Sequence, residues 1–200
     1  MSFSRMTIAA LACSVALLLN APSQADTTSH WPADSVYQID PKLETSDGRT
    51  VSFASSGRIR IATMFYASCP MACPLLIDTL RNLDAALSPA ERAQVDILLI
   101  SMDPERDTPA ALAGLARERH ITDKRWTLAR TSSAETRKLA AILGIQYRKL
   151  DTGDFNHASV LVLLDAQGRV LARSQKLGMP DPAFLMQLRA AERVSASRRP

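Results

Sequence analysis

The chain of 200 residues lacks several features that define whole classes of protein. Its N-terminal apolar stretch, Thr7–Leu19, has thirteen residues, fewer than the roughly 20 that a membrane-spanning helix needs. The 24 lysines and arginines exceed the 20 acidic residues only slightly and are scattered, and aromatic residues make up 5%. Without a concentrated basic face that carries aromatics, we expect no nucleic-acid partner. The sequence shows no internal repeat or low-complexity tract, and it holds only three cysteines.

Residues 1–25 have the layout of a secretory signal peptide. Arg5 precedes the apolar stretch, Asn20 and Pro22 interrupt it, and small residues up to Ala25 offer a cleavage site. We therefore expect a periplasmic or otherwise exported protein that is peripheral to the membrane at most; an uncleaved N-terminal anchor is the alternative. Cys13 lies inside the signal, so the mature protein would keep two cysteines.

Removing residues 1–25 from the 200 leaves 175, which is enough for one well-buried domain. A hydrophobic content of 46% with 22% charged residues is ordinary for a globular protein. We expect a flexible leader at 26–35, a single domain at 36–195 and a frayed tail at 196–200.

The spacing of apolar residues predicts alternating strands and helices. Expected strands cover 37–39, 50–53, 58–66, 95–101, 126–129, 160–165 and 169–173. Expected helices cover 74–87, 109–120 and 133–143, and Asp181-Pro182 opens a last one. Helices between strands imply parallel crossovers, and the late pair of strands forms an antiparallel hairpin. The order β-β-β-α-β-α-β-α-β-β-α predicts one α/β domain.

The segment CPMACP, residues 69–74, is the strongest candidate for chemistry. Cys69 and Cys73 stand where a strand is followed by a helix, and the free N–H groups of a helix start favour thiolates. Such a pair can cycle between dithiol and disulfide, or it can bind a soft metal. A purely structural disulfide is the third interpretation, although so local a bridge would restrict the unfolded chain little and stabilise little.

Three motifs occur in a telling order: the strand–CPMACP–helix segment, the run SMDPERDTP at 101–109, and F-x-H at Phe155–His157. Together they resemble the Sco/SenC family over nearly the whole mature chain. The resemblance implies a thioredoxin-like fold with a central mixed sheet flanked by helices and N-terminal strand additions. It also implies a protein that delivers copper to cytochrome c oxidase or reduces the cysteines of its copper site.

By this resemblance Cys69, Cys73 and His157 would bind one copper ion per chain, as Cu(I) or Cu(II). Two thiolates and an imidazole suit both oxidation states. We expect His157 in a loop just before a strand that neighbours the one ending near Cys69, so that it can reach across. No role is expected for His30 or His120.

Asp103 and Asp107 match acidic positions of the family's DPxxDTP run, and two roles stay open. They can shape the helix start, with Thr108 as its cap, or they can orient the cysteine loop and the copper ligands. The chain departs from the family pattern at Met71, where a polar residue is usual, at residues 66–68, and in its apparent lack of a membrane anchor. None of these departures removes a ligand.

The expected partners are the copper-site subunit of cytochrome c oxidase, or another copper protein, and a periplasmic dithiol reductant. A reductant is needed because export exposes the thiols to oxidation. An exported thiol-disulfide reductase without obligatory metal is the competing function, but such enzymes usually carry CxxC and a cis-proline where His157 stands. The peroxiredoxin pattern P-x-x-x-T-x-x-C fails at Ala62 and Tyr66. A copper store without a delivery partner also stays open.

Overall fold

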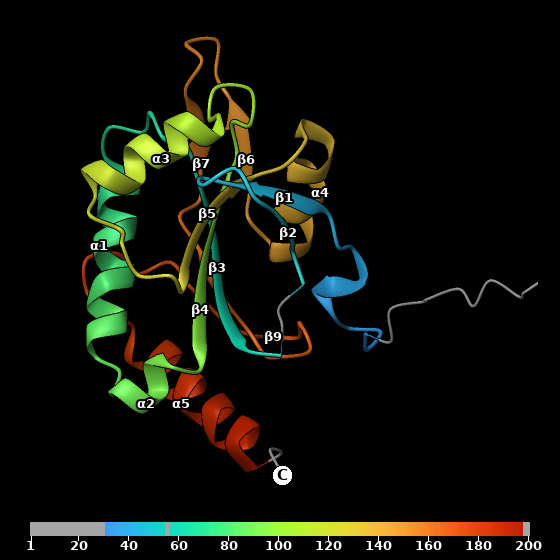
Figure 1. Ribbon diagram of the computed structural model, residues 1–200, viewed down its shortest axis with the longest axis vertical. Coiled ribbons are helices and arrows are strands. Elements are labelled where there is room, and N and C mark those ends of the chain that lie inside the picture. Colours follow the sequence, from blue (N-terminus) through green and yellow to red (C-terminus); the bar gives the residue numbers. More distant parts are fainter. Residues whose placement is uncertain (1–30, 55–56, 198–200) are drawn as a thin grey trace, which may run out of the picture.

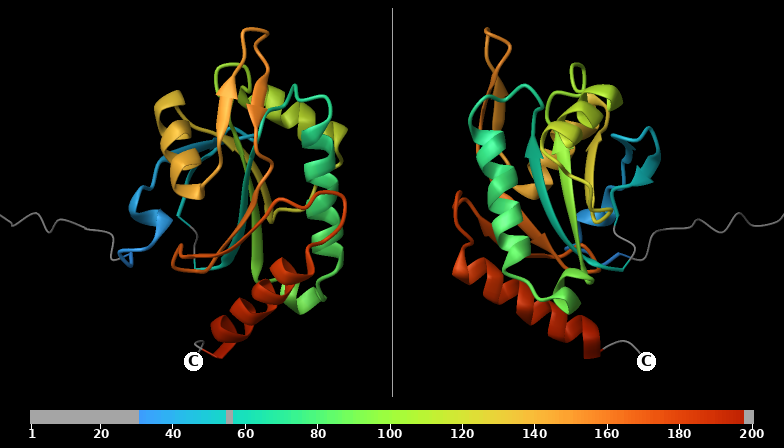
Figure 2. Two further views of the ribbon diagram at one scale, coloured as in Figure 1. Left: turned by 180° about the vertical axis from the view of Figure 1, so that it is seen from behind. Right: turned by 60° about the vertical axis from the view of Figure 1, so that its left-hand side comes forward.

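The computed structural model describes residues 31–54 and 57–197, which form a seven-stranded sheet covered by helices (Figures 1 and 2). The sheet has the order β2-β1-β5-β4-β3-β8-β9. Its strands are β1 (Lys42–Thr45), β2 (Thr50–Ser52), β3 (Ile59–Phe65), β4 (Val95–Ser101), β5 (Trp126–Arg130), β8 (Leu161–Leu164) and β9 (Val170–Ser174). A separate two-stranded sheet pairs β6 (Tyr147–Lys149) with β7 (Phe155–His157).

The centre of the main sheet consists of the parallel strands β3, β4 and β5. Six of seven residues are buried in both β3 and β4, as expected for strands covered on both faces. β8 and β9 extend the sheet antiparallel on one side. On the other side β1 pairs antiparallel with the much later β5, through Glu44 opposite Arg130. The predicted mixed sheet with N-terminal strand additions is confirmed.

The helices are α1 (Ala72–Ala85), α2 (Pro89–Arg92), α3 (Pro109–Glu118), α4 (Ser133–Leu143) and α5 (Pro182–Ser197). Helices α1, α3 and α5 lie on one face of the sheet and α4 lies on the other (Figures 1 and 2). The caps are local: Thr108 and Ser132 accept hydrogen bonds from backbone N–H groups three residues later. Gly144 ends α4 with a φ of 71°. The bounds of α4 and the starts of α3 and α5 match the predictions, whereas α1 begins and ends two residues earlier than predicted and α3 ends two residues earlier. The short helix α2 was not predicted. No helix of the described chain is long and apolar enough to cross a bilayer.

The predicted strand at 37–39 is wrong, because Val36–Gln38 forms a 3-10 helix. The Ser35 hydroxyl caps it by accepting the N–H of Tyr37 at 3.1 Å. The buried Tyr37 ring packs edge-on against Phe53, with centroids 5.5 Å apart, and against Trp31 at 5.2 Å. Residues 31–35, which we expected in a flexible leader, therefore lie against the domain.

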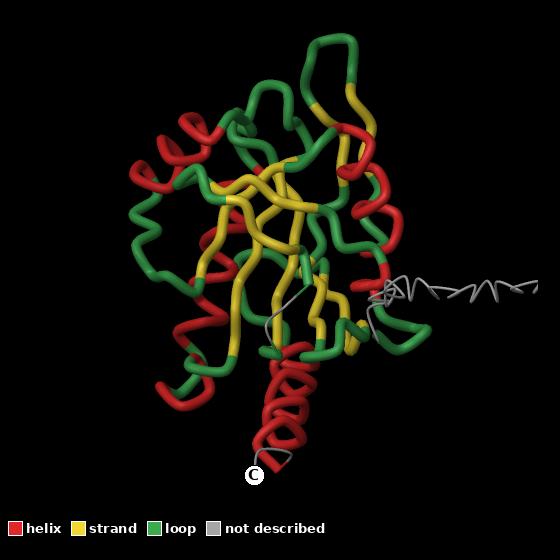
Figure 3. Tube along the Cα trace, turned by 45° about the vertical axis from the view of Figure 1, so that its right-hand side comes forward, coloured by secondary structure: helices red, strands yellow, loops and turns green. Residues whose placement is uncertain are grey.

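Neither β1 nor the β6–β7 hairpin was predicted from the sequence. The hairpin stands apart from the main sheet (Figure 3), beyond the carboxyl end of β3 (Figure 1). The predicted signal peptide and residues 26–30 lie outside the described residues. Of the predicted tail at 196–200, residues 196 and 197 belong to α5.

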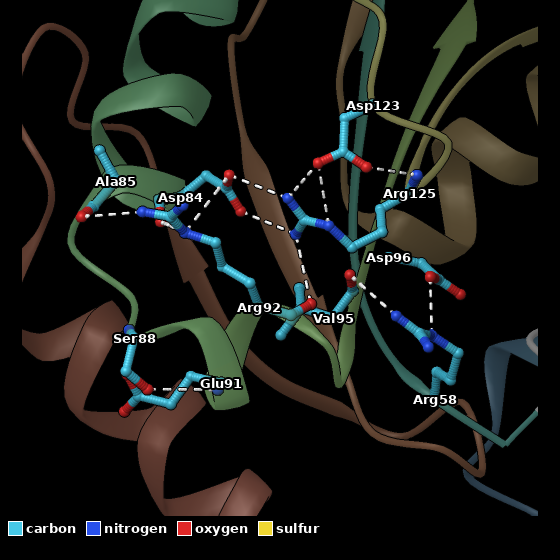
Figure 4. Close-up of polar contacts among 10 residues, drawn as sticks. All are labelled: Arg58, Asp84, Ala85, Ser88, Glu91, Arg92, Val95, Asp96, Asp123 and Arg125. Atoms are coloured by element: carbon cyan, nitrogen blue, oxygen red, sulfur yellow. Dashed lines mark hydrogen bonds and ion pairs between the residues drawn. The ribbon is translucent and has the colours of Figure 1, made fainter.

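A network of ion pairs lies at the end of the sheet where β3 and β4 begin, opposite to the end that carries the hairpin (Figure 4). Arg125, just before β5, donates to both carboxylate oxygens of Asp84 near the end of α1, at 2.8 and 3.0 Å, and also binds Asp123. Arg58 pairs with Asp96 at 2.8 Å where β3 and β4 begin. The Arg125 side chain is only 16% exposed, and the carboxylate of Asp84 raises its pKa. This network ties α1 to the sheet at the end away from the cysteines.

Candidate metal centre

The cysteine loop, residues 66–71, links β3 to α1 at the carboxyl end of the parallel strands. Met71 is the N-cap residue but makes no capping hydrogen bond with its side chain. Instead, the sulfur of Cys69 accepts the N–H of Cys73 at 3.3 Å. Cys73 is the second residue of α1 and Pro74 the third, close to their predicted places. The thiol of Cys69 therefore satisfies one of the free donors of the helix start.

The two thiols are free, buried and electrostatically different. Burial tends to raise the pKa of Cys69, but hydrogen bonds from the Cys73 thiol and from backbone N–H groups of residues 71–73 outweigh it and lower that pKa. Burial dominates at Cys73 and raises its pKa. Cys69 is therefore the sulfur that becomes thiolate first, and thiolate is the form that attacks disulfides and binds metals.

His157 is the last residue of β7 rather than part of a loop, so its predicted loop position is wrong. Its side chain is half-buried, and its Nδ1 atom is fully buried without a hydrogen-bond partner in the described chain. The ring stands edge-on to Tyr66, with centroids 5.8 Å apart. Burial lowers the pKa of His157, which favours the neutral imidazole that metals bind.

One atom each of Cys69, Cys73 and His157 lies within 4.8 Å of the others, and no other cluster of this kind occurs in residues 31–54 and 57–197. Ligands held at about 2.0 to 2.3 Å from one ion are at most about 4.6 Å apart. Small side-chain rotations would therefore bring all three groups to a shared ion. Two thiolates and a nitrogen that lacks a partner fit a soft or borderline metal such as copper or zinc.

Asp107 supports the cysteine loop through a hydrogen bond to its backbone. Its carboxylate is 2% exposed and accepts hydrogen bonds from the backbone N–H of Ala67 at 3.0 Å and from the Ser101 hydroxyl at 2.5 Å. Burial raises the pKa of this carboxyl. Thr108, next in the chain, caps α3. The segment therefore combines both roles that the sequence left open, a helix start and support for the loop that carries Cys69.

Asp103 is also 2% exposed and lies outside the ligand cluster. It forms an ion pair with Arg106, and Lys149 of β6 approaches it to 3.9 Å. Asp103 therefore faces the hairpin of the histidine, whereas Asp107 faces the cysteine loop. His120 lies beyond the end of α3 and is not part of the cluster; His30 lies outside the described residues.

The sequence did not identify Tyr66 as a wall of the site. Its ring packs on Phe155, with centroids 5.2 Å apart, as well as on His157. The sequence signal for this role was the position of Tyr66, an aromatic residue between a buried strand and the cysteine loop. Arg106 was also overlooked, although it stands between the two aspartates of the DPERDTP run.

A cavity of about 210 Å³ opens onto the cysteines between α1 and α3. Both cysteines line it, together with the apolar Ile77 and Leu115 and the charged Arg119. Met71, at the loop tip, is 81% exposed. A larger cavity of about 450 Å³ lies beside α5 and contains none of the candidate ligands. The cavity at the cysteines gives a partner molecule access to the sulfurs.

Comparison with known proteins gives a consistent result. A family model described as SCO1/SenC matches residues 35–190, which include every candidate ligand. The chain is 27% identical over 140 residues to the SCO1 protein homolog of Bacillus subtilis (strain 168), covering 68% of this chain and 72% of that protein. It is 35% identical over 75 residues to a Stutzerimonas stutzeri protein named "Putative copper-binding protein". That match covers 36% of this chain and only 37% of the relative.

Solved structures show the same fold. ScoI of Arabidopsis thaliana with copper bound superposes with a TM-score of 0.61 at 19% identity, over 80% of this chain and 98% of that one. BsSco, a member of the Sco family of cytochrome c oxidase assembly proteins with a disulfide switch, superposes with a TM-score of 0.65 at 23% identity. It covers 79% of this chain and 92% of that one. These likenesses confirm the predicted thioredoxin-like fold.

Proposed function

Because the chain belongs to the SCO1/SenC family, we propose that it is an exported copper carrier for cytochrome c oxidase assembly. Cys69, Cys73 and His157 bind one copper ion as cargo, and the protein delivers it to the oxidase copper site or reduces the cysteines of that site. The observation that carries the proposal is the convergence of two thiols and an imidazole within 4.8 Å. The buried Nδ1 of His157 without a partner adds to it.

The chemistry of the relatives supports copper as the metal. One relative carries copper binding in its name, and the ScoI structure holds copper. Thiolates prefer the soft Cu(I) ion, whereas an imidazole nitrogen adds more to the binding of Cu(II). A site with both ligand types can hold the ion in either oxidation state. The signal-like N-terminus supports export. Outside the cytoplasm the chain could meet other copper proteins and the copper site of the oxidase.

Binding requires both thiols to lose their protons. Cys69 is prepared for this, since its pKa is lowered, and the ion itself must displace the proton of Cys73, whose pKa is raised. The imidazole needs no deprotonation because burial keeps it neutral. Metal loading therefore releases protons mainly from the sulfurs.

The same thiols can exchange with a disulfide of the partner. The Cys69 thiolate attacks one partner sulfur, forming a mixed disulfide and releasing one partner thiolate. Cys73 then loses its proton and attacks the Cys69 sulfur, which releases the second partner thiolate and leaves a Cys69–Cys73 disulfide. Two electrons pass to the partner, and an exported dithiol reductant must return them before copper can bind again.

A thiol-disulfide reductase without metal is the second candidate function. The lowered pKa of Cys69 and the cavity beside it favour thiol exchange. Against it, residues 31–54 and 57–197 contain no cis peptide bond, and His157 occupies the place expected for the cis-proline of such enzymes. The imidazole at the dithiol favours the copper carrier.

A copper titration of the reduced and the oxidised protein tests the proposal. We expect one Cu(II) per reduced chain, with intense sulfur-to-copper charge-transfer absorption, and no such band for the disulfide form. Added reductant should restore binding. Equal affinity in both states would exclude the dithiol as the ligand set. Reduction of a protein disulfide by a chain with no measurable copper affinity would favour the reductase.

A further inference from the structure

The hairpin that carries His157 forms no backbone ladder with the main sheet among the described strands, and it joins that sheet through residues 158–160, which lead into β8. β6 and β7 pair only with each other among the described strands, and their register places Tyr147 opposite His157. Backbone ladders fix the cysteine loop through β3 and hold the chain that follows His157 through β8. The turn at the far end of the hairpin has no ladder to the main sheet in the described residues, so side-chain contacts tie it to the rest of the domain.

Arg106 makes the contact that reaches the turn of the hairpin. Its Nε donates to the buried carboxylate of Asp103, and its Nη2 donates to the backbone carbonyl of Gly153, 47 residues later, at the turn of the hairpin. The glycine backbone has a φ of +86°, and a Cβ there would lie 3.5 Å from Arg106 Nη1. One guanidinium thus joins the DPERDTP segment to the turn of the hairpin.

The same short segment also holds the cysteine loop. The N–H groups of Arg106 and Asp107 both donate to the carbonyl of Asp103, at 3.1 and 2.9 Å, so the segment forms a tight turn. Asp107 at its end accepts the N–H of Ala67, two residues before Cys69. One rigid turn therefore contacts both the loop of the cysteines and the hairpin of the histidine.

We infer that Arg106 is a positioning residue for the third copper ligand: it clamps the hairpin turn at Gly153 so that His157 meets Cys69 and Cys73. This inference rests on the proposed copper function. Lys149 supports the clamp, since it lies on the hairpin and approaches Asp103 to 3.9 Å. Loss of Arg106 leaves both cysteines in place but frees the turn at the far end of the hairpin.

The clamp requires arginine rather than any cation. A guanidinium presents several N–H donors in a fixed plane, so it can bind a carboxylate on one side and a carbonyl on another. The ammonium of lysine is a point charge on a flexible stem. It can keep the ion pair with Asp103, but it cannot hold both partners in fixed geometry. Arg106→Lys should therefore rescue the variant only in part.

The experiment compares Arg106→Gln, Arg106→Lys and wild type in the full reduced chain. Copper-supporting contacts beyond the ligands typically change affinity about 10- to 100-fold when removed. We expect Arg106→Gln to weaken Cu(II) by about tenfold or more, to leave Cu(I) nearly unchanged, and to shift the charge-transfer band in the direction that His157→Ala does. Arg81→Gln removes an exposed arginine paired with Asp78 and serves as the matched control without effect.

A second arm identifies the route of the effect. In a His157→Ala background, Arg106→Gln should cause no further loss of Cu(II) affinity, because the imidazole that Arg106 positions is already absent. Amide exchange of the metal-free Arg106→Gln chain should accelerate in residues 147–157 and stay slow in β3, β4 and β5, which also shows that the variant folds.

The outcomes separate the two proposals. If wild type shows no thiolate–copper band, the proposed function fails. If wild type binds copper and Arg106→Gln matches it in affinity and spectrum, the positioning role is overturned. An equal loss of affinity with and without His157 would also overturn it, because Arg106 would then act on the cysteines or on the fold.

Discussion

The carboxylate of Asp107 accepts the backbone N–H of Ala67 at 3.0 Å, joining two residues that lie 40 positions apart in the chain. Asp107 is on the turn before α3, and Ala67 is on the loop before α1. This one hydrogen bond connects the DPERDTP segment to the loop that presents Cys69. It gives a physical meaning to the spacing of the two motifs.

Asp107→Ala should destabilise the metal-free protein by about 1 to 3 kcal/mol, since the buried N–H of Ala67 and hydroxyl of Ser101 lose their acceptor. Asp107→Asn keeps one side-chain oxygen and should cost less. Chemical denaturation measures both. Asp78→Ala, on the exposed face of α1, is the control. An Asp107→Ala protein as stable as wild type would show that water replaces the carboxylate at no cost.

The two cysteines should differ in reactivity. Because the pKa of Cys69 is lowered and that of Cys73 is raised, Cys69 carries more thiolate at any given pH. Alkylation of the reduced, metal-free protein should therefore modify Cys69 first and at lower pH, as peptide mass mapping over a pH series would show. In copper binding, Cys69→Ser and Cys73→Ser should each abolish the charge-transfer band. Preferential alkylation of Cys73 would contradict the assignment of Cys69 as the first thiolate.

His157→Ala should weaken Cu(II) binding far more than Cu(I) binding, because the two thiolates hold the softer ion by themselves. The metal-free protein should change in stability by no more than about 1 kcal/mol, since the substitution removes ring packing on Tyr66 but also removes a buried nitrogen without a partner. Competition titrations with Cu(I) and Cu(II) chelators, together with thermal unfolding, measure the two effects. A large loss of stability with unchanged Cu(II) affinity would make His157 a structural residue.

Glu192 of α5 should make stability depend on pH. Its side chain is buried, and its Oε1 has no hydrogen-bond partner among the described residues. Burial raises its pKa to about 7, helped by Glu91 and opposed by Arg189 and Arg193. Between about pH 4.5 and 7 the folded protein keeps a proton that the unfolded chain releases, so stability falls as pH rises through this window.

Glu192→Gln removes this titration. At pH 8 it should be more stable than wild type by about 1 to 3 kcal/mol, and near pH 4 the two proteins should be equal. Urea unfolding at both pH values measures the difference. Glu118→Gln, at a largely exposed carboxylate, serves as the matched control. A constant difference at both pH values would point to packing rather than ionisation.

Local signals account for the elements that the sequence predicted well. Thr108-Pro109 and the pair Ser132 and Glu135 place helix starts by their own hydrogen bonds, and Gly144 ends α4 through its left-handed backbone. The cysteine half of the site belongs to this class. A buried strand, a short loop and a helix start within a few residues are enough to bring Cys69 to the N–H groups of α1.

The position of His157 depends on tertiary contacts that no local sequence pattern predicts. β6 is half-exposed to exposed along Tyr147–Lys149, so it lacks the apolar alternation of a strand. Only the turn around Gly153 hinted at a hairpin. Tyr37 misled in the opposite sense, since its burial comes from the rings of Trp31 and Phe53 and not from strand pairing. Tertiary packing decided these elements, and propensity did not.

The pairing of β1 with β5 affects the order in which the fold can assemble. Glu44 lies opposite Arg130 and binds it through an ion pair and a hydrogen bond across 86 residues of chain. The pairs β3–β4 and β4–β5 join strands of much lower sequence separation, and contacts of lower sequence separation generally form faster. When the chain grows from its N-terminus, β1 and β2 can pair with each other early, but they cannot join the main sheet until β5 exists. The first strands made therefore reach their place in the main sheet only after β3, β4 and β5 have been made.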